Sequence, residues 1–116
     1  MEKMTTSPKS DVMPGTLDLL VLKTLDTLGP LHGYAIAERL HQVSRALLDV
    51  NQGSLYPALL RLEHDGAVGS KWGTTEHNRK ARYYSITKAG RRRLAEEAGK
   101  WERMADVMAR VLDGAF

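Results

Sequence analysis

Apolar residues recur at intervals of three and four along the first half of the chain, which is the spacing of one face of an α-helix. The pattern predicts a first helix over residues 16–28 and a second over about residues 33–43. A third helix follows Asn51, which is placed as its N-cap, and ends at Asp65-Gly66, where the glycine suits a left-handed C-cap. The first half of the chain is therefore expected to be helical.

In the next segment the hydrophobic period changes from that of a helix to the alternation of a strand. Residues 67–72 and 82–87 predict two strands, and the polar residues 73–81 between them predict a long loop, so this segment is expected to form a hairpin. Trp72, in the first of these strands, is expected to lie in the core. Residues 29–33 are too short for a strand of their own but could pair as a single bridge beside the hairpin.

A final helix is expected after Thr87, which is placed as its N-cap, and runs nearly to the end of the chain. Its apolar positions alternate by four and three residues, the heptad pattern of a helix that packs against another helix. This seam consists of Leu94, Ala98, Trp101, Ala105, Met108 and Leu112. A domain of this size buries only about two-thirds of its unfolded surface, so we expect the seam to pair two copies of the chain as a homodimer.

The order of these elements predicts a mainly α fold with a small β-hairpin: a winged helix-turn-helix followed by a long C-terminal dimerisation helix. Residues 1–14, polar and aperiodic, are expected to form a flexible N-terminal arm, residues 15–87 the winged-helix domain, and residues 88–116 the dimerisation helix. In such a fold the third helix enters the major groove of duplex DNA, and the hairpin lies along the neighbouring backbone or minor groove.

The charge of the chain is concentrated in one stretch. The net charge is +3, but residues 71–93 carry eight basic residues against one acidic residue, and the segments on either side are each slightly acidic. On charge alone a solvated surface loop is as good an explanation as a site for nucleic acid. The position of this stretch on the hairpin and the strand that leaves it favours contact with phosphates.

Eight side chains on the third helix and the hairpin are candidate contacts to double-stranded DNA: Gln52, Ser54, Tyr56, Arg61, Asn78, Arg79, Lys80 and Arg82. The last four are the stronger candidates, because they place several donors close together on the hairpin. Tyr56 could equally pack against the first helix, and Arg61 could equally be a solvated charge. Three arginines at positions 91–93 open the last helix, where the helix dipole disfavours cations, which slightly favours another use for them.

Four segments of the chain, in the same order and spacing, resemble the PadR family of bacterial transcriptional regulators: GTLDLLVL (15–22), GPLHGYAI (29–36), GSLYPALLRLE (53–63) and RKARYYSITKAG (79–90). The resemblance covers about residues 15–112. It implies a homodimeric winged-helix regulator, usually a repressor, that binds an operator with dyad symmetry. The last helix resembles that of the shorter-tailed members, in which one long helix serves dimerisation.

The resemblance also bears on Trp101, near the middle of the seam. Interface packing is the simpler role for this side chain. Some relatives of the fold bind flat aromatic effectors between tryptophans at the dimer interface, which makes a small-molecule effector pocket beside Trp101 a second hypothesis. The sequence does not identify such an effector.

The sequence lacks the residue patterns of common catalytic and metal-binding sites. The chain has no cysteine, its four histidines lack metal-ligand spacing, and Ser54 lacks the glycines of a nucleophile elbow. His41 and His64 are expected on the surface. We therefore expect no enzyme, no metal ion and no cofactor.

The apolar runs are too short to cross a bilayer or to form a signal peptide, so we expect a cytoplasmic protein with no membrane contact. Two other functions remain as alternatives: a winged-helix module that binds protein, and a protein that binds RNA through the same basic hairpin.

Overall fold

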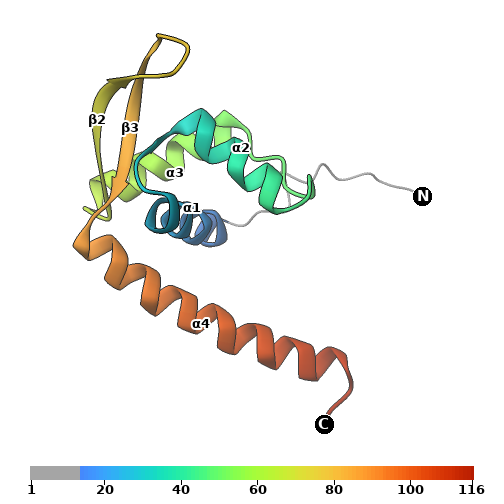
Figure 1. Ribbon diagram of the computed structural model, residues 1–116. Helices are drawn as coiled ribbons and strands as arrows, with labels where there is room; N and C mark the ends of the chain where they lie inside the picture. Colours follow the sequence, from blue (N-terminus) through green and yellow to red (C-terminus); the bar gives the residue numbers. More distant parts are fainter. Residues whose placement is uncertain (1–13) are drawn as a thin grey trace.

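The computed structural model describes residues 14–116, which form four helices and three strands (Figure 1). In chain order the elements are α1 (Pro14–Leu28), β1 (Leu31–His32), α2 (Gly33–Val43), α3 (Gln52–His64), β2 (Val68–Thr74), β3 (Lys80–Ile86) and α4 (Lys88–Leu112). This order confirms the predicted winged helix-turn-helix with a long final helix. The predicted N-terminal arm, residues 1–14, lies outside the described residues except for Pro14.

Three helices begin at a side chain that accepts a hydrogen bond from the backbone of the first turn. Asn51 Oδ1 accepts from the third residue of α3 at 2.8 Å, and the Thr87 hydroxyl accepts from the third residue of α4 at 3.0 Å, so both predicted caps are confirmed. His32 Nδ1 caps α2 in the same way at 3.3 Å. α1 starts two residues earlier than predicted, with Pro14 in the first position, where a missing backbone N–H costs nothing.

The sheet is antiparallel with the strand order β1-β3-β2, so the predicted bridge is present as the two-residue strand β1. The loop of the hairpin spans residues 75–79 and is shorter than the predicted 73–81. Thr75 closes this turn, because its N–H donates to the carbonyl of Arg79 at 2.8 Å and its Oγ1 accepts from the Arg79 N–H at 3.2 Å. Backbone pairing therefore continues into a segment whose polarity had predicted a loop.

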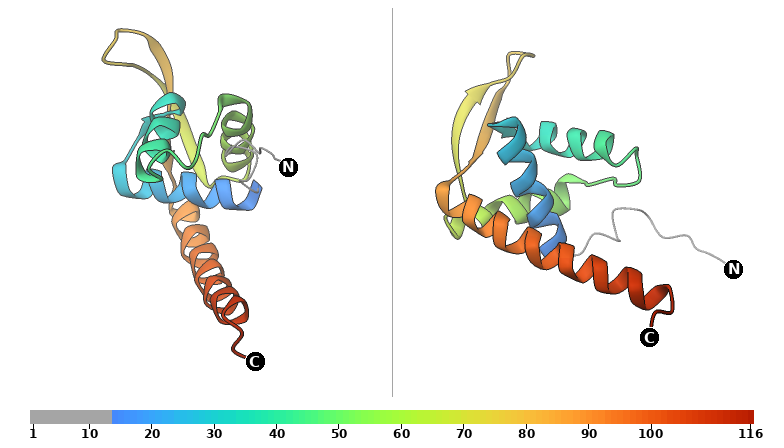
Figure 2. Two further views of the ribbon diagram at one scale, coloured as in Figure 1. Left: turned by 90° about the vertical axis from the view of Figure 1, so that its right-hand side faces the viewer. Right: turned by 60° about the horizontal axis from the view of Figure 1, so that its bottom comes forward.

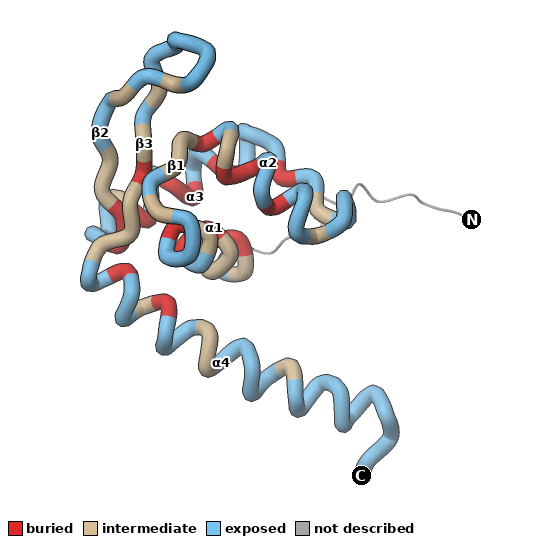
Figure 3. Tube along the Cα trace, viewed as in Figure 1, coloured by how far each residue is buried: buried red, intermediate tan, exposed pale blue. Residues whose placement is uncertain are grey.

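The core lies where the first three helices meet. Leu22 and Leu25 of α1, Ile36 of α2, and Leu55 and Leu59 of α3 are fully buried in it, and the base of the hairpin closes it from one side (Figure 3). Each such side chain contributes about 2 kcal/mol relative to leaving it in water. The helices that carry the candidate site therefore rest on one shared apolar centre.

The start of α4 is held in close contact with the base of the hairpin. A Cβ atom at Gly90 would overlap the carbonyl oxygen of Ala67, so this approach requires a glycine, and the Thr87 N–H donates to the same carbonyl at 3.0 Å. From there α4 passes α1, and its outer half stands away from the other elements and is exposed (Figures 2 and 3). Within residues 14–116, no helix combines the length and apolar character needed to span a membrane.

Candidate nucleic-acid interface

The amino end of α3 presents polar side chains to solvent. Gln52 and Ser54 are exposed in its first turn, beside the cap formed by Asn51. Tyr56 is 45% exposed, and its ring lies over the start of α2, where a Cβ atom added at Gly33 would be 3.2 Å from the phenol oxygen. Part of the Tyr56 ring thus packs against the start of α2. Its exposed part remains accessible at the same end of α3.

Arg61 is placed differently from the other candidates on α3. Its Nη2 atom donates to Asp18 Oδ1 on α1 at 2.9 Å, and Asp18 is only 8% exposed. This guanidinium is not an unpaired solvated charge: its side chain is 49% exposed, but the pair holds it beside α1. We therefore leave Arg61 out of the proposed DNA contacts.

Two of the three arginines at the start of α4 have a structural use that the sequence had only suggested. Arg93 donates to Asp18 at 3.4 Å and to Asp65 at 3.2 Å, and Arg91 donates to Asp26 at 3.3 Å. These bonds tie α4 to α1 and to the end of α3. The helix dipole is unfavourable to cations here, and the carboxylates opposite them offset that cost.

The tip of the hairpin carries the candidate basic residues. Asn78 and Arg79 lie in the loop, with Asn78 in the left-handed backbone region at a φ of 61°, and Lys80 begins β3. All three are exposed. Among the ion pairs formed within residues 14–116, none involves Arg79 or Lys80. Their charges are therefore available to an anionic partner.

Arg82 lies lower on the hairpin and is oriented by neighbours. Its Nε donates to Ser70 Oγ at 2.9 Å, and its Nη2 lies 3.9 Å from Glu63 on α3. Directly opposite it in the register stands Trp72, whose ring centroid is 5.3 Å from the Arg82 guanidinium carbon. Trp72 is 62% exposed, so the prediction that it lies in the core is wrong. The hairpin extends past the helices (Figure 1), and the described residues leave most of the Trp72 side chain uncovered.

The predicted seam on α4 is divided between two environments. Leu94 is 7% exposed and belongs to the core of its own chain, against α1. Trp101, Met108 and Leu112 are exposed, and Ala98 and Ala105 are partly buried. The apolar surface open to another chain therefore begins one heptad later than the sequence pattern had indicated.

Three further apolar side chains on α4 are exposed beside this seam, and the sequence reading had not included them: Met104, Val107 and Val111. They follow the same three- and four-residue spacing, displaced along the helix, so a search for a second heptad stripe would have found them. Together with the seam they make a wide apolar face on the outer half of α4.

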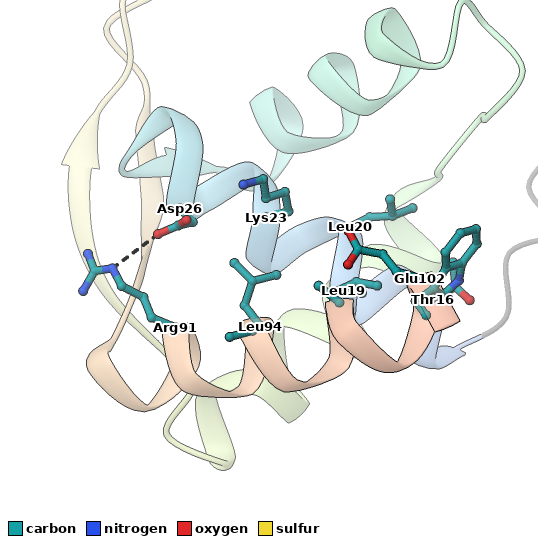
Figure 4. A pocket seen from close by; sticks show the side chains of 11 residues that line it. Thr16, Leu19, Leu20, Lys23, Asp26, Arg91, Leu94 and Glu102 are labelled. Atoms are coloured by element: carbon teal, nitrogen blue, oxygen red, sulfur yellow. Dashed lines mark hydrogen bonds and ion pairs between the residues drawn. The ribbon is translucent and has the colours of Figure 1, made fainter. Parts of the chain in front are cut away.

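A groove of about 610 Å³ lies between α1 and the inner half of α4 (Figure 4). Its apolar wall comes from Leu19 and Leu20 on one side and from Leu94 on the other, and the Asp26–Arg91 ion pair lies at one end. Trp101 is among the lining residues, which is consistent with the hypothesis of an effector pocket beside it but does not test it. Within the described residues, no group of three or more potential metal ligands is present.

Comparison with known proteins relates this chain to a family of transcriptional regulators. Residues 21–96 match the model of the Transcriptional regulator PadR-like family. A transcriptional regulator from Clostridium thermocellum is 30% identical with a TM-score of 0.77, over 87% of this chain and 94% of that one. A PadR family transcriptional regulator from Eggerthella lenta is 32% identical with a TM-score of 0.72, over 84% of this chain and 82% of that one. Among curated sequences, "Uncharacterized protein X" of Lysinibacillus sphaericus is 24% identical, over 91% of this chain and 96% of that protein.

Proposed function

Because this chain belongs to the PadR-like family of transcriptional regulators, we propose that it is a homodimeric repressor that binds a DNA operator with dyad symmetry. Membership in this family confirms the expectation that the chain is not an enzyme. An operator-binding protein acts where the chromosome is, so we propose a cytoplasmic location.

The main support for this proposal is that the basic hairpin and the apolar face of α4 are well separated. The basic hairpin and the outer half of α4 lie at opposite ends of the molecule (Figure 1), so a chain that pairs through α4 leaves the hairpin open to DNA. At the DNA end, α3 would enter the major groove with Gln52, Ser54 and Tyr56 near base edges or phosphates. The hairpin residues Arg79 and Lys80 would hold the neighbouring backbone.

The exposed apolar face of α4 supports the homodimer. Trp101 is 53% exposed, and the face around it continues to the end of the helix without a partner in the described chain. Monomeric proteins rarely expose a contiguous apolar patch of this kind without a use for it. A second copy of α4 would cover the patch with the same residues, as a two-fold interface requires. The two α3 helices would then reach major grooves about 34–36 Å apart, or a multiple of that distance.

In vitro selection of bound duplexes from a random library tests the function directly. We expect the purified protein to recover an inverted repeat whose half-sites are one helical turn, or a whole number of turns, apart. Affinity for that duplex should fall steeply with salt, since each phosphate contact releases counterions. Equal affinity for RNA and duplex DNA, or an affinity that does not depend on salt, would contradict the proposal.

The groove between α1 and α4 supports a second proposed role, binding of a planar aromatic effector beside Trp101. The apolar lining would stack on or surround such a ring, and the charged residues at its ends would orient polar substituents. Titration with 1-naphthol as a probe should give saturable binding that is lost in Trp101→Ala and kept in Trp72→Ala. Equal binding by both variants would rule out this site.

A further inference from the structure

Trp72 is a large aromatic side chain that the core does not use. In the strand register, Val68, Ser70 and Trp72 alternate on one face of β2. Near the base of the hairpin this face is turned inward, since Val68 is buried and so is Tyr84, which stands opposite Ser70 on β3. Further along the hairpin the same face emerges from the helices, and there it carries Trp72 and, opposite it, Arg82.

Contacts with α3 show which way this face is turned. Ser70 Oγ donates to Glu63 Oε2, near the end of α3, at 2.6 Å, and accepts from Arg82 Nε at 2.9 Å. Trp72 is the next residue outward on the same face. Trp72 therefore lies on the side of the hairpin that is turned toward α3.

Two cations accompany the indole. The Arg82 guanidinium carbon lies 5.3 Å from the ring centroid, and the Lys80 Nζ lies 5.9 Å from it. Both are within the range of a cation–π contact. Trp72 is still 62% exposed, so the surface here combines an exposed indole ring with two positive groups.

We infer that Trp72 packs against the deoxyriboses of the DNA strand that passes between α3 and the hairpin, with Lys80 and Arg82 directed to the phosphates of that strand. The inference rests on the proposed function. When a helix occupies the major groove and a hairpin occupies the adjacent minor groove, one sugar–phosphate strand separates them. That strand must pass the face of the hairpin on which Trp72 lies. The C–H surface of a deoxyribose is apolar, and its flanking phosphates are anionic. The sugar can therefore pack on the Trp72 ring while the phosphates on either side meet Lys80 and Arg82.

This contact would add affinity that does not come from counterion release. In Trp72→Ala we expect a loss of roughly tenfold, about 1.4 kcal/mol, at every salt concentration, because an exposed aromatic surface is no longer buried. The slope of log K against log salt should stay at its wild-type value. Lys80→Ala is the matched control, since it should reduce that slope by about one unit. A Trp72→Ala protein with wild-type affinity would overturn the inference.

A direct measurement uses the fact that the chain has two tryptophans. Protein labelled with 5-fluorotryptophan gives one ¹⁹F signal for each, and Trp72→Phe assigns the signal of Trp72 by its disappearance. On saturation with an operator duplex of about 30 base pairs, long enough for two half-sites, the Trp72 signal should shift. The difference in its position between H₂O and D₂O, which reports exposure to solvent, should shrink. An unchanged signal and an unchanged solvent effect in the saturated complex would overturn the inference.

The two failures are distinguishable. If the wild-type protein does not bind any duplex, the proposed function fails and the labelled signal has no complex to report. If it binds the selected duplex while Trp72 stays equally exposed, the proposed function stands and the inference about Trp72 falls. Trp72→Phe separates packing from hairpin integrity, since it keeps an aromatic ring and should bind more tightly than Trp72→Ala.

Discussion

Asp18 joins three helices through its two carboxylate oxygens. The residue is nearly buried on α1, where its Oδ1 accepts from Arg61 of α3 at 2.9 Å and its Oδ2 accepts from Arg93 of α4 at 3.4 Å. Burying a lone carboxylate is costly, and two guanidinium groups offset that cost. The same pairs hold both arginines beside α1, with each side chain still partly exposed.

Asp18→Asn should lower the free energy of unfolding by about 1–2 kcal/mol, because two arginines lose a charged acceptor. The effect should stay below that of a fully buried pair, since both guanidinium groups are partly exposed. Urea denaturation at fixed protein concentration measures the change. Asp26→Asn is the matched control: it breaks the more exposed pair with Arg91, so a loss below about 1 kcal/mol is expected. Equal losses in both variants would contradict this account.

Tyr84 gives the fold a dependence on alkaline pH. Burial raises the pKa of its phenol above the usual value of about 10, and the nearby Glu63 carboxylate raises it further. Above pH 10 the folded chain then holds a proton that the unfolded chain releases. The contribution of Tyr84 to stability is therefore complete below pH 10 and is lost as the pH rises above it. In unfolding measured from pH 8 to 11, Tyr84→Phe should lose less stability at the alkaline end than the wild-type protein, and parallel curves would contradict this.

The contacts and exposure of single residues were harder to predict from the sequence than the helices and strands. Arg61 and Arg93 pair with Asp18, which lies far from both along the chain, and a pattern of local spacing cannot show such a contact. Trp72 was assigned to the core because a large aromatic residue in a strand is usually covered. In the structure Trp72 is exposed on the hairpin, opposite Arg82, and local sequence alone does not show how far the hairpin extends from the core.

At the scale of elements, the hairpin carries basic residues at its exposed tip. Arg79→Ala and Lys80→Ala should weaken binding to all duplexes and lower the salt slope by about one unit for each lost contact. Titrations of a fluorescent duplex at several salt concentrations measure this. Arg91→Ala removes the same charge from a residue paired with Asp26 and should leave the slope unchanged. An unchanged slope in the hairpin variants would remove the hairpin from the proposed interface.

Elements with a clear periodicity were predicted well. The bounds of α2 are those expected from its apolar spacing, and the caps at Asn51 and Thr87 place the starts of α3 and α4. The hairpin strands were predicted too short, because residues 73–81 are polar and polarity had been taken to indicate a loop. On a hairpin that extends away from the core, polar side chains are compatible with backbone pairing.

At the scale of the whole molecule, the wide apolar face of α4 is the surface through which we propose that two copies pair. Changing both Trp101 and Met108 to glutamate should place charges in the proposed interface and give monomers with operator affinity lower by orders of magnitude, since one chain then engages one half-site. Sedimentation velocity measures the assembly. Leu47→Glu changes a leucine that is even more exposed, in the turn between α2 and α3, and should stay dimeric. A dimer that survives both charges would contradict the α4 interface.

The position of Asp18 has a consequence for the operator. Through one carboxylate it holds both α3, the proposed reading helix, and α4, the proposed pairing helix. The angle between these helices sets how far apart the two copies of α3 stand in a dimer. In the proposed dimer, the preferred spacing of half-sites would thus depend on a side chain that belongs to neither proposed interface. A change at Asp18 should alter which spacing is bound best before it alters which bases are read.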